Sequence, residues 1–263
     1  MNNLQESLSI LSNSFTSVKF IDSATVPVIK LQIDMQKMRQ KIIQQEVTRF
    51  GKTNTPATID QDMRFLGMDI TFEDMGPHTY TEVNQYGGTV SKINLGIECV
   101  NYISSLCMQL KDLKPIVLIL KKLLQCKNLN QPYLGGLSSY SLVLMTSSFL
   151  KSQNTNSMAK NLTEFLNYYG NFFNPYMTQL DGENFYPIYD IRSDPIIVND
   201  PLNQHNNTTR NAFRVQEVLN MFRKSHQVIV KSLDEFQLEG EHDGEDRHTV
   251  KVVEKIISGQ LDF

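Results

Sequence analysis

Two glycines stand directly ahead of two serines and a tyrosine in the segment PYLGGLSSYSLVLM, residues 132–145. Ser138 or Ser139 can cap the helix that the following apolar residues predict, because a hydroxyl there accepts a hydrogen bond from an unpaired amide. The same residues suit a phosphate, since glycine permits close backbone approach and a helix N-terminus presents N–H groups and the positive end of its dipole. Capping and anion binding both remain open for this segment taken alone.

A lysine and an aspartate stand in otherwise apolar surroundings. Lys121, in the helix-like run PIVLILKKLLQCK, either extends its amino group to water or reaches a ligand, and one short loop separates it from GGLSSY. A lysine and a helix N-terminus could therefore share one phosphate. Asp69 lies inside the short strand-like run MDITFE, where a carboxylate is unfavourable unless it lies at an exposed edge or binds a metal. Both alternatives stay open for Asp69.

Polar residues gather in the loop-like segment DPLNQHNNTTRNAF, which contains Asp200, Asn206, Asn207 and Arg210. Loops rich in Asn and Asp usually form turns and caps. Amide side chains carry both donors and acceptors, so they also suit recognition of a base edge. The segment alone favours the turn and leaves the second use open.

The composition indicates an ordinary soluble intracellular protein. The 263 residues are 40% hydrophobic and 20% charged, enough for one large domain or two smaller ones. A net charge of −3 gives no sign of nucleic-acid binding by the chain as a whole, so any RNA contact requires a local basic strip. Three cysteines without a CxxC pair argue against a zinc site or a disulfide framework, and no apolar run reaches the length of a membrane span. We therefore expect no membrane partner.

Hydrophobic periodicity predicts an α+β protein with strands first and helices after them. We expect a strand, turn and strand over 17–33, a further strand around Asp69, and insertions at 34–64 (polar, basic and helix-like, then a loop) and 75–93. The helical period predicts helices over 96–111, 115–127, 138–150, 158–172 and 214–230. The expected domains are 1–90, 91–231 and a flexible acidic tail, 232–263.

Several segments, in their order along the chain, resemble the poly(A) polymerase-like terminal nucleotidyltransferases, in particular the nuclear RNA-surveillance type related to the poly(U) polymerases. They are VPVIKL, MDITFE, LGIE, LKPIVLILKKLL, NLNQPYLGGLSSYSLVLM, LTEFLNYYGNFFN and VNDPLNQHNNTTRNAFRV, and the resemblance spans 18–230. It implies a partial nucleotidyltransferase palm with few strands, packed on a mainly α-helical central, PAP-associated domain, with ATP between the two. It also implies RNA 3′-end adenylyl transfer, a nuclear location, and RNA-binding and helicase partner subunits.

The resemblance also assigns roles to the residues above. Asp69 matches the third palm carboxylate that binds Mg²⁺ or Mn²⁺, Lys121 the lysine on the triphosphate, and Tyr140 the tyrosine that stacks on the base. Ser138 and Ser139 match the phosphate-contacting positions. The nucleotide-recognition loop matches Asp200, Asn206, Asn207 and Arg210.

The recognition loop favours ATP over UTP. Uridylyl-transferring relatives tend to carry histidine where Asn206 stands, and here His205 lies one position early. Gln125 stands where such relatives often have a second phosphate-binding lysine. The residues at both positions favour adenylyl transfer over uridylyl transfer.

One part of the family pattern is missing. A working member carries a Gly-Ser turn and an Asp-x-Asp pair before VPVIKL, whereas residues 1–20 contain no glycine and Glu6 as their only acidic residue. The pair Asp60 and Asp62 follows the wrong strand. We therefore expect the chain to lack the first two catalytic carboxylates, either as an N-terminally incomplete form of an active adenylyltransferase or as an inactive pseudo-nucleotidyltransferase that binds nucleotide or RNA. An unrelated helical domain remains a third alternative.

Overall fold

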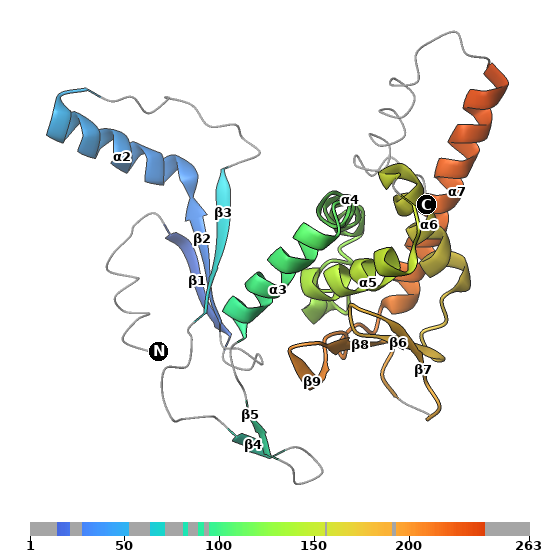
Figure 1. Ribbon diagram of the computed structural model, residues 1–263. Coiled ribbons are helices and arrows are strands. Elements are labelled where there is room, and N and C mark those ends of the chain that lie inside the picture. The colour runs from blue at the N-terminus through green and yellow to red at the C-terminus, as the bar shows by residue number, and fades with distance from the viewer. Residues whose placement is uncertain are drawn as a thin grey trace. The chain divides into compact units, whose positions relative to one another are not determined.

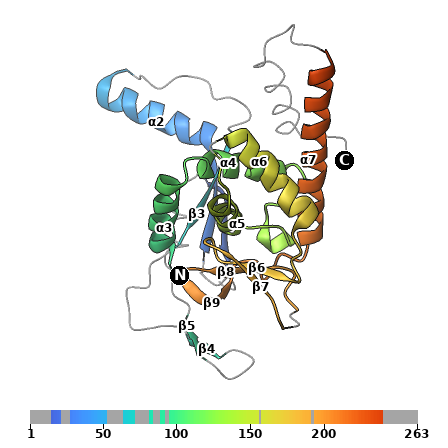
Figure 2. The ribbon, with the colours of Figure 1, turned by 45° about the vertical axis from the view of Figure 1, so that its right-hand side comes forward.

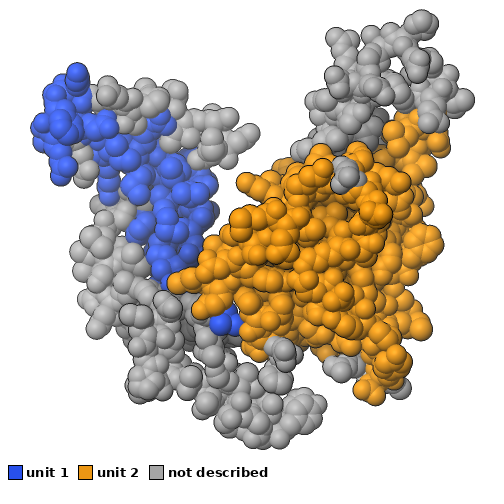
Figure 3. All heavy atoms as spheres, in the orientation of Figure 1, with its two compact units in different colours: residues 1–96 blue, residues 97–263 orange. Residues whose placement is uncertain are grey.

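The computed structural model describes residues 15–21, 28–52, 64–71, 81–83, 89–91, 95–155, 157–190 and 193–239 (Figure 1). The chain forms two compact units, residues 1–96 and 97–263, which Figure 3 colours separately. Strands with an inserted helix make up the described part of the first unit, and helices with a small sheet make up the second. The α+β class expected from the sequence is confirmed.

A three-stranded antiparallel sheet organises the first unit. Its strands β1 (Phe15–Ile21), β2 (Val28–Asp34) and β3 (Phe65–Ile70) lie in the order β1-β2-β3. Leu31 of β2 lies opposite Val18 and Met68, and because side chains alternate along a strand, this register places most of the apolar residues of the three strands on one face. Lys30 and Asp69 lie on the other, polar face.

The first insertion forms a helix, α2 (Met35–Phe50), in agreement with the helix-like run in the sequence. Asp34 is both the last residue of β2 and the N-cap of α2, where its side chain accepts hydrogen bonds from the N–H groups of Gln36 and Lys37. Gly51 ends the helix with φ of 68°, the left-handed conformation that glycine adopts most easily. In Figure 1, α2 continues from the end of β2 and turns away from the sheet.

The second insertion contains a hairpin of two short strands, β4 (Thr81–Val83) and β5 (Thr89–Ser91). The sequence predicted a looser segment here, and this was wrong for these residues. Three-residue strands give too short an alternation for a sequence pattern to detect.

Five helices form the body of the second unit: α3 (Gly96–Gln109), α4 (Leu113–Gln125), α5 (Ser139–Ser152), α6 (Met158–Asn167) and α7 (Val215–Glu239). A short 3₁₀ turn, η2 (Pro132–Leu134), precedes α5, and a π-helical turn, η3 (Tyr168–Phe172), follows α6. Every residue from Ser141 to Leu150 is buried, and Figure 2 shows α5 in the middle of the other elements. A helix buried all round in this way fixes the position of its own N-terminus.

A four-stranded sheet lies beside these helices. It contains β6 (Thr178–Leu180), β7 (Phe185–Pro187), β8 (Ile197–Asp200) and β9 (Asn203–Asn207) in the order β7-β6-β8-β9, with β6 and β8 parallel and the other neighbours antiparallel. The sequence missed β6 and predicted only a turn where β9 forms. Both strands are short and polar, which hides them from pattern reasoning.

The flexible acidic tail was expected from residue 232, which is too early. Helix α7 runs to Glu239, whereas the sequence analysis ended the helix at 230 and began a flexible tail at 232. Ile229 is buried, whereas Leu233, one turn later, is 51% exposed, so the helix continues past the expected boundary with its side chains facing solvent there. Residues 240–263 lie outside the described residues.

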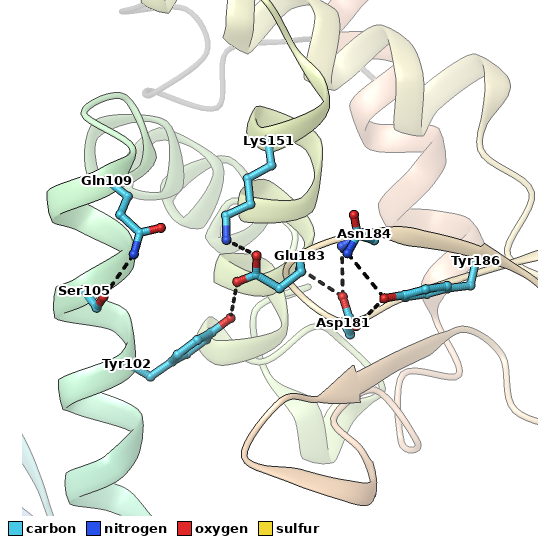
Figure 4. A network of polar contacts seen from close by, with 8 residues as sticks. All are labelled: Tyr102, Ser105, Gln109, Lys151, Asp181, Glu183, Asn184 and Tyr186. Atoms are coloured by element: carbon cyan, nitrogen blue, oxygen red, sulfur yellow. Dashed lines mark hydrogen bonds and ion pairs between the residues drawn. The ribbon is translucent and has the colours of Figure 1, made fainter.

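Polar contacts hold the β6–β7 hairpin between α3 and α5 (Figure 4). Glu183 accepts a hydrogen bond of 3.2 Å from the hydroxyl of Tyr102 on α3 and pairs with Lys151 on α5. Gly182 has φ of 89°, and a Cβ at this position would lie 2.7 Å from a methyl carbon of Leu144. The hairpin tip therefore requires glycine, because a larger residue would displace it from α5.

Candidate nucleotide-binding site

The approach to α5 explains both glycines of GGLSSY by packing within the chain. Gly135 has φ of 84° and ends the η2 turn, and a Cβ added to it would lie 2.3 Å from the ring of Phe213. A Cβ on Gly136 would lie 2.2 Å from the carbonyl oxygen of Leu129. The glycines thus allow the loop to fold tightly against its own neighbours, rather than only leaving room for a ligand.

The capping role of Ser138 is visible in the structure. Its hydroxyl accepts a hydrogen bond of 2.9 Å from the N–H of Ser141, and the two serine hydroxyls lie 2.6 Å apart. Ser141 in turn donates to the carbonyl oxygen of Thr208 at 3.0 Å, which ties the start of α5 to the loop after β9. Ser139 is the exposed first residue of the helix. The N-terminal turn of α5 is therefore fixed in position, with its remaining N–H groups available as donors.

Asp200 joins Tyr140 to the β8–β9 hairpin. Its side chain is buried and accepts a hydrogen bond of 2.9 Å from the Tyr140 hydroxyl, one of 3.0 Å from the Asn206 amide and one of 3.0 Å from the N–H of Leu202. An ionised carboxylate only accepts hydrogen bonds, so three donors from two elements satisfy it well. Three of the residues expected to bind nucleotide thus lie together.

The electrostatics of this cluster keep Tyr140 protonated. Partial burial, followed by the charge of Asp200 and the hydrogen bond to it, raises the pKa of the Tyr140 hydroxyl well above its usual value. The thiol of Cys99 on α3 contacts the same hydroxyl, and burial together with the charge of Asp200 raises its pKa. A protonated hydroxyl remains a donor to Asp200 and holds the tyrosine ring at its outer end.

Two members of the cluster were missed from the sequence. Cys99 lies in another helix, and no pattern connects it with Tyr140. Ser141 stands three residues after the N-cap, a spacing at which side chains and caps commonly interact, and that signal could have found it.

The remaining candidates of the second unit differ in their surroundings. Asn207 accepts hydrogen bonds from the N–H groups of Val198 and Thr209 and donates to Ile196, so its amide holds the loop against β8. Lys121 is half-buried on α4 and Arg210 is exposed, and neither side chain makes a hydrogen bond or ion pair within the described part of the chain. These two cations are available to an anion.

Asp69 lies in the other compact unit, residues 1–96. It stands directly opposite Lys30 on the polar face of the sheet, with 2.7 Å between the lysine nitrogen and a carboxylate oxygen, and 56% of its side chain is exposed. Of the two alternatives left open for Asp69, exposure to water accounts for its position. Among the described residues, no three His, Cys, Asp or Glu side chains gather as a metal site requires, so Asp69 alone does not form one. Asp60 and Asp62 lie outside the described residues.

Comparison with known proteins gives a consistent result. No protein-family model matches the chain. It is 26% identical over 157 residues to the Caenorhabditis elegans poly(A) RNA polymerase gld-4, an alignment covering 51% of this chain and 19% of the relative. It is also 26% identical over 147 residues to poly(A) RNA polymerase protein 2 of Saccharomyces cerevisiae, covering 48% of the chain and 25% of the relative. The resemblance to poly(A) polymerase-like nucleotidyltransferases is confirmed.

Solved structures of poly(A) and poly(U) polymerase-like proteins share the fold. The polymerase core of TRAMP, an RNA surveillance complex, superposes with a TM-score of 0.64 at 20% identity, over 100% of this chain and 71% of that one. The Cid1 poly(U) polymerase, solved with magnesium and 3′-dATP, gives a TM-score of 0.53 at 19% identity, over 88% of this chain and 70% of its own. The nucleotidyltransferase fold expected from the sequence is thus confirmed, while the chain spans only a quarter or less of the two curated relatives.

No helix in the described ranges combines the length and the apolar character needed to cross a bilayer.

Proposed function

We propose that the chain takes part in template-independent transfer of AMP from ATP to the 3′ end of an RNA. The observation that carries this proposal is the buried Asp200, which holds Tyr140 and Asn206 together beside the N-terminus of α5. A fixed aromatic ring, a fixed amide and a helix N-terminus are the parts needed to bind a base and its phosphates. The names of the curated relatives, both poly(A) RNA polymerases, support the same activity.

Each residue has a proposed role in binding ATP. The ring of Tyr140 stacks on the base, and the first turn of α5 with Ser138 and Ser139 donates to phosphate oxygens. Lys121 and Arg210 supply positive charge to the triphosphate. In the reaction, the RNA 3′ oxygen bonds to the α-phosphorus, the bond from that phosphorus to the bridging oxygen breaks, and pyrophosphate leaves.

The orientation of Asn206 bears on the choice of base. Because Asp200 only accepts hydrogen bonds, the Asn206 amide must turn its nitrogen toward the carboxylate, and its oxygen remains as an acceptor. An acceptor suits the exocyclic amino group of adenine. We therefore propose ATP as the substrate.

A divalent cation, Mg²⁺ or Mn²⁺, neutralises the triphosphate in reactions of this class. The described residues offer it one carboxylate, Asp69, whose charge Lys30 already balances. We further propose a nuclear location and RNA-binding or helicase partner subunits, which rest on the likeness to the polymerase core of TRAMP.

An extension assay with a 5′-labelled RNA tests the activity. Extension by the purified chain with ATP more than with UTP, GTP or CTP, together with its arrest by EDTA, would show transfer by this chain although its first two catalytic carboxylates are expected to be missing. If Asp69 contributes to a metal site, Asp69→Asn should reduce the extension observed while changing stability by less than about 1 kcal/mol, because exposed ion pairs contribute little. Extension by Asp69→Asn at the wild-type rate would rule out the metal role of this carboxylate.

A second candidate is a nucleotide-binding subunit that performs no transfer. It is favoured by the pairing of Asp69 with Lys30 and by the absence of a metal-binding cluster within the described ranges. Calorimetric titration with ATP separates the two functions. Binding without extension supports the non-catalytic subunit, and no binding at all contradicts both.

A further inference from the structure

The inserted helix α2 forms a basic stretch of the chain. Between Met35 and Lys52 the sequence contains five lysines and arginines and one acidic residue, Glu46, for a local net charge of +4. The whole chain carries −3, so the remainder carries −7. An ordinary solvated helix mixes charges of both signs, and this concentration of positive charge marks a surface suited to an anion.

Lys37 and Lys41 share one face of the helix, whereas Arg39 lies on the opposite face. Lys37, Lys41, Gln44 and Thr48 follow one another at spacings of four, three and four residues, which places them on a single face. Lys41, Gln44, Thr48 and Arg49 line an open cavity of about 290 Å³. Cations and polar side chains therefore meet around one hollow.

The cations of this hollow are not neutralised within the described residues. The side chains of Lys41 and Arg49 make no ion pair or hydrogen bond there, and Glu46, one turn before Arg49, has a partner of its own. Asp34 is occupied in capping the helix. Two such cations beside a polar hollow suit phosphate groups, and the Gln44 amide can donate to phosphate or ribose oxygens, while the Thr48 hydroxyl donates to the carbonyl oxygen of Gln44.

We propose that α2 binds the phosphate backbone of a single-stranded RNA, an inference that rests on the proposed function of the chain. An anionic membrane is the competing partner for a basic helix, but Arg39 and Glu46 interrupt the side that carries Ile42 and Phe50. A helix that lies in a membrane surface needs a continuous apolar face, and α2 has none. RNA, which requires only positive and hydrogen-bonding groups, fits the observed surface.

The test measures binding of a fluorescein-labelled oligo(A) RNA to the full chain by anisotropy over a range of salt concentrations. Lys41→Gln combined with Arg49→Gln should weaken binding roughly 10- to 30-fold at about 0.1 M salt, and should lower the slope of log K against log salt by about 1.4. Both values follow from the loss of two phosphate contacts. The combination of Lys41→Arg and Arg49→Lys keeps the charge and should restore most of the affinity.

Two controls make the result specific. Lys111→Gln combined with Lys114→Gln removes the same charge from exposed positions in the other unit and should change RNA affinity less than 3-fold. ATP titration and circular dichroism should show unchanged nucleotide affinity and folding for the α2 variant.

Three outcomes would overturn the inference. RNA affinity unchanged in the α2 variant, or a loss equal to that of the Lys111 and Lys114 control, would contradict it while leaving the proposed function standing. Binding of the wild-type chain to phosphatidylserine vesicles but not to RNA would identify a membrane surface instead. Failure of the wild-type chain to bind either ATP or RNA would contradict the proposed function as well.

Discussion

The hydroxyl of Tyr140 donates to the buried carboxylate of Asp200 at 2.9 Å, although 60 residues separate the two in sequence. Tyr140 belongs to the first turn of α5 and Asp200 to the end of β8. The contact connects the stretch that suits phosphate with the loop that suits a base. It gives a direct way to ask whether the two act as one site.

Asp200→Ala should both destabilise the chain and weaken ATP binding. It removes the acceptor for Tyr140, Leu202 and Asn206, and buried donors without a partner cost about 1–3 kcal/mol. Urea unfolding should show a loss of about 3 kcal/mol, and calorimetry an ATP affinity at least 10-fold weaker. Asp190→Ala, at an exposed position, is the matched control, and wild-type ATP affinity in Asp200→Ala would contradict the single-site interpretation.

Tyr140→Phe and Tyr140→Ala should separate the hydroxyl from the ring. Phenylalanine keeps a stacking surface and loses one hydrogen bond, so stability should fall by about 1 kcal/mol and ATP affinity by only a few-fold. Alanine removes the stacking surface and should weaken binding about 5- to 100-fold. Equal ATP affinities for the two variants would show that the ring does not contact the base.

Gly136→Ala should lower the thermal stability, since the added Cβ would lie 2.2 Å from the carbonyl oxygen of Leu129. We expect a loss of about 1–3 kcal/mol, because backbone must move to admit the methyl group. Gly67→Ala is the control: nothing lies within 4 Å of its added Cβ, and stability should stay within about 0.5 kcal/mol. Similar melting temperatures for both variants would refute the packing explanation of the GGLSSY glycines.

The chain should lose stability in alkaline solution. Burial raises the pKa of Tyr169 well above its usual value, so this hydroxyl stays protonated in the folded state while it ionises near pH 10 in the unfolded chain. The stabilisation is complete below that pH and falls by about 1.4 kcal/mol per pH unit above it. Urea midpoints between about pH 8 and pH 11 measure the slope. Tyr169→Phe should reduce the slope, and an unchanged slope would show that this tyrosine ionises equally in both states.

The sequence predicted the parts of the site that follow local rules. A cap at Ser138 or Ser139 could be predicted because a hydroxyl ahead of an apolar helical run commonly accepts from an unpaired amide, and α4 around Lys121 followed from its periodicity. The resemblance, rather than the periodicity, placed Asp200 and Asn206 in one site with Tyr140. The role of each residue in binding nucleotide stays a prediction.

What the sequence could not show depends on contacts between distant elements. Cys99 meets Tyr140 only because α3 packs beside α5, and no spacing within either segment records that contact. The surroundings of Asp69 were uncertain for the same reason, since the strand register alone places Lys30 beside it. The strands β6 and β9 were not predicted because each is only three to five residues long and mostly polar. They form through pairing with neighbouring strands rather than through the β propensity of their own residues.

Strand β2 and helix α2 are joined directly, with no linker residues between them. Asp34 ends the strand and caps the helix, and the N–H of Met35, the first helical residue, donates to the carbonyl oxygen of Arg64 at 2.8 Å, so the ladder between the strands runs on into the helix. A force that rotates α2 would therefore act directly on the pairing of β2 with β3, because no flexible linker separates the helix from these strands. The force would be transmitted along β2 and β3, the two strands whose pairing places Lys30 opposite Asp69.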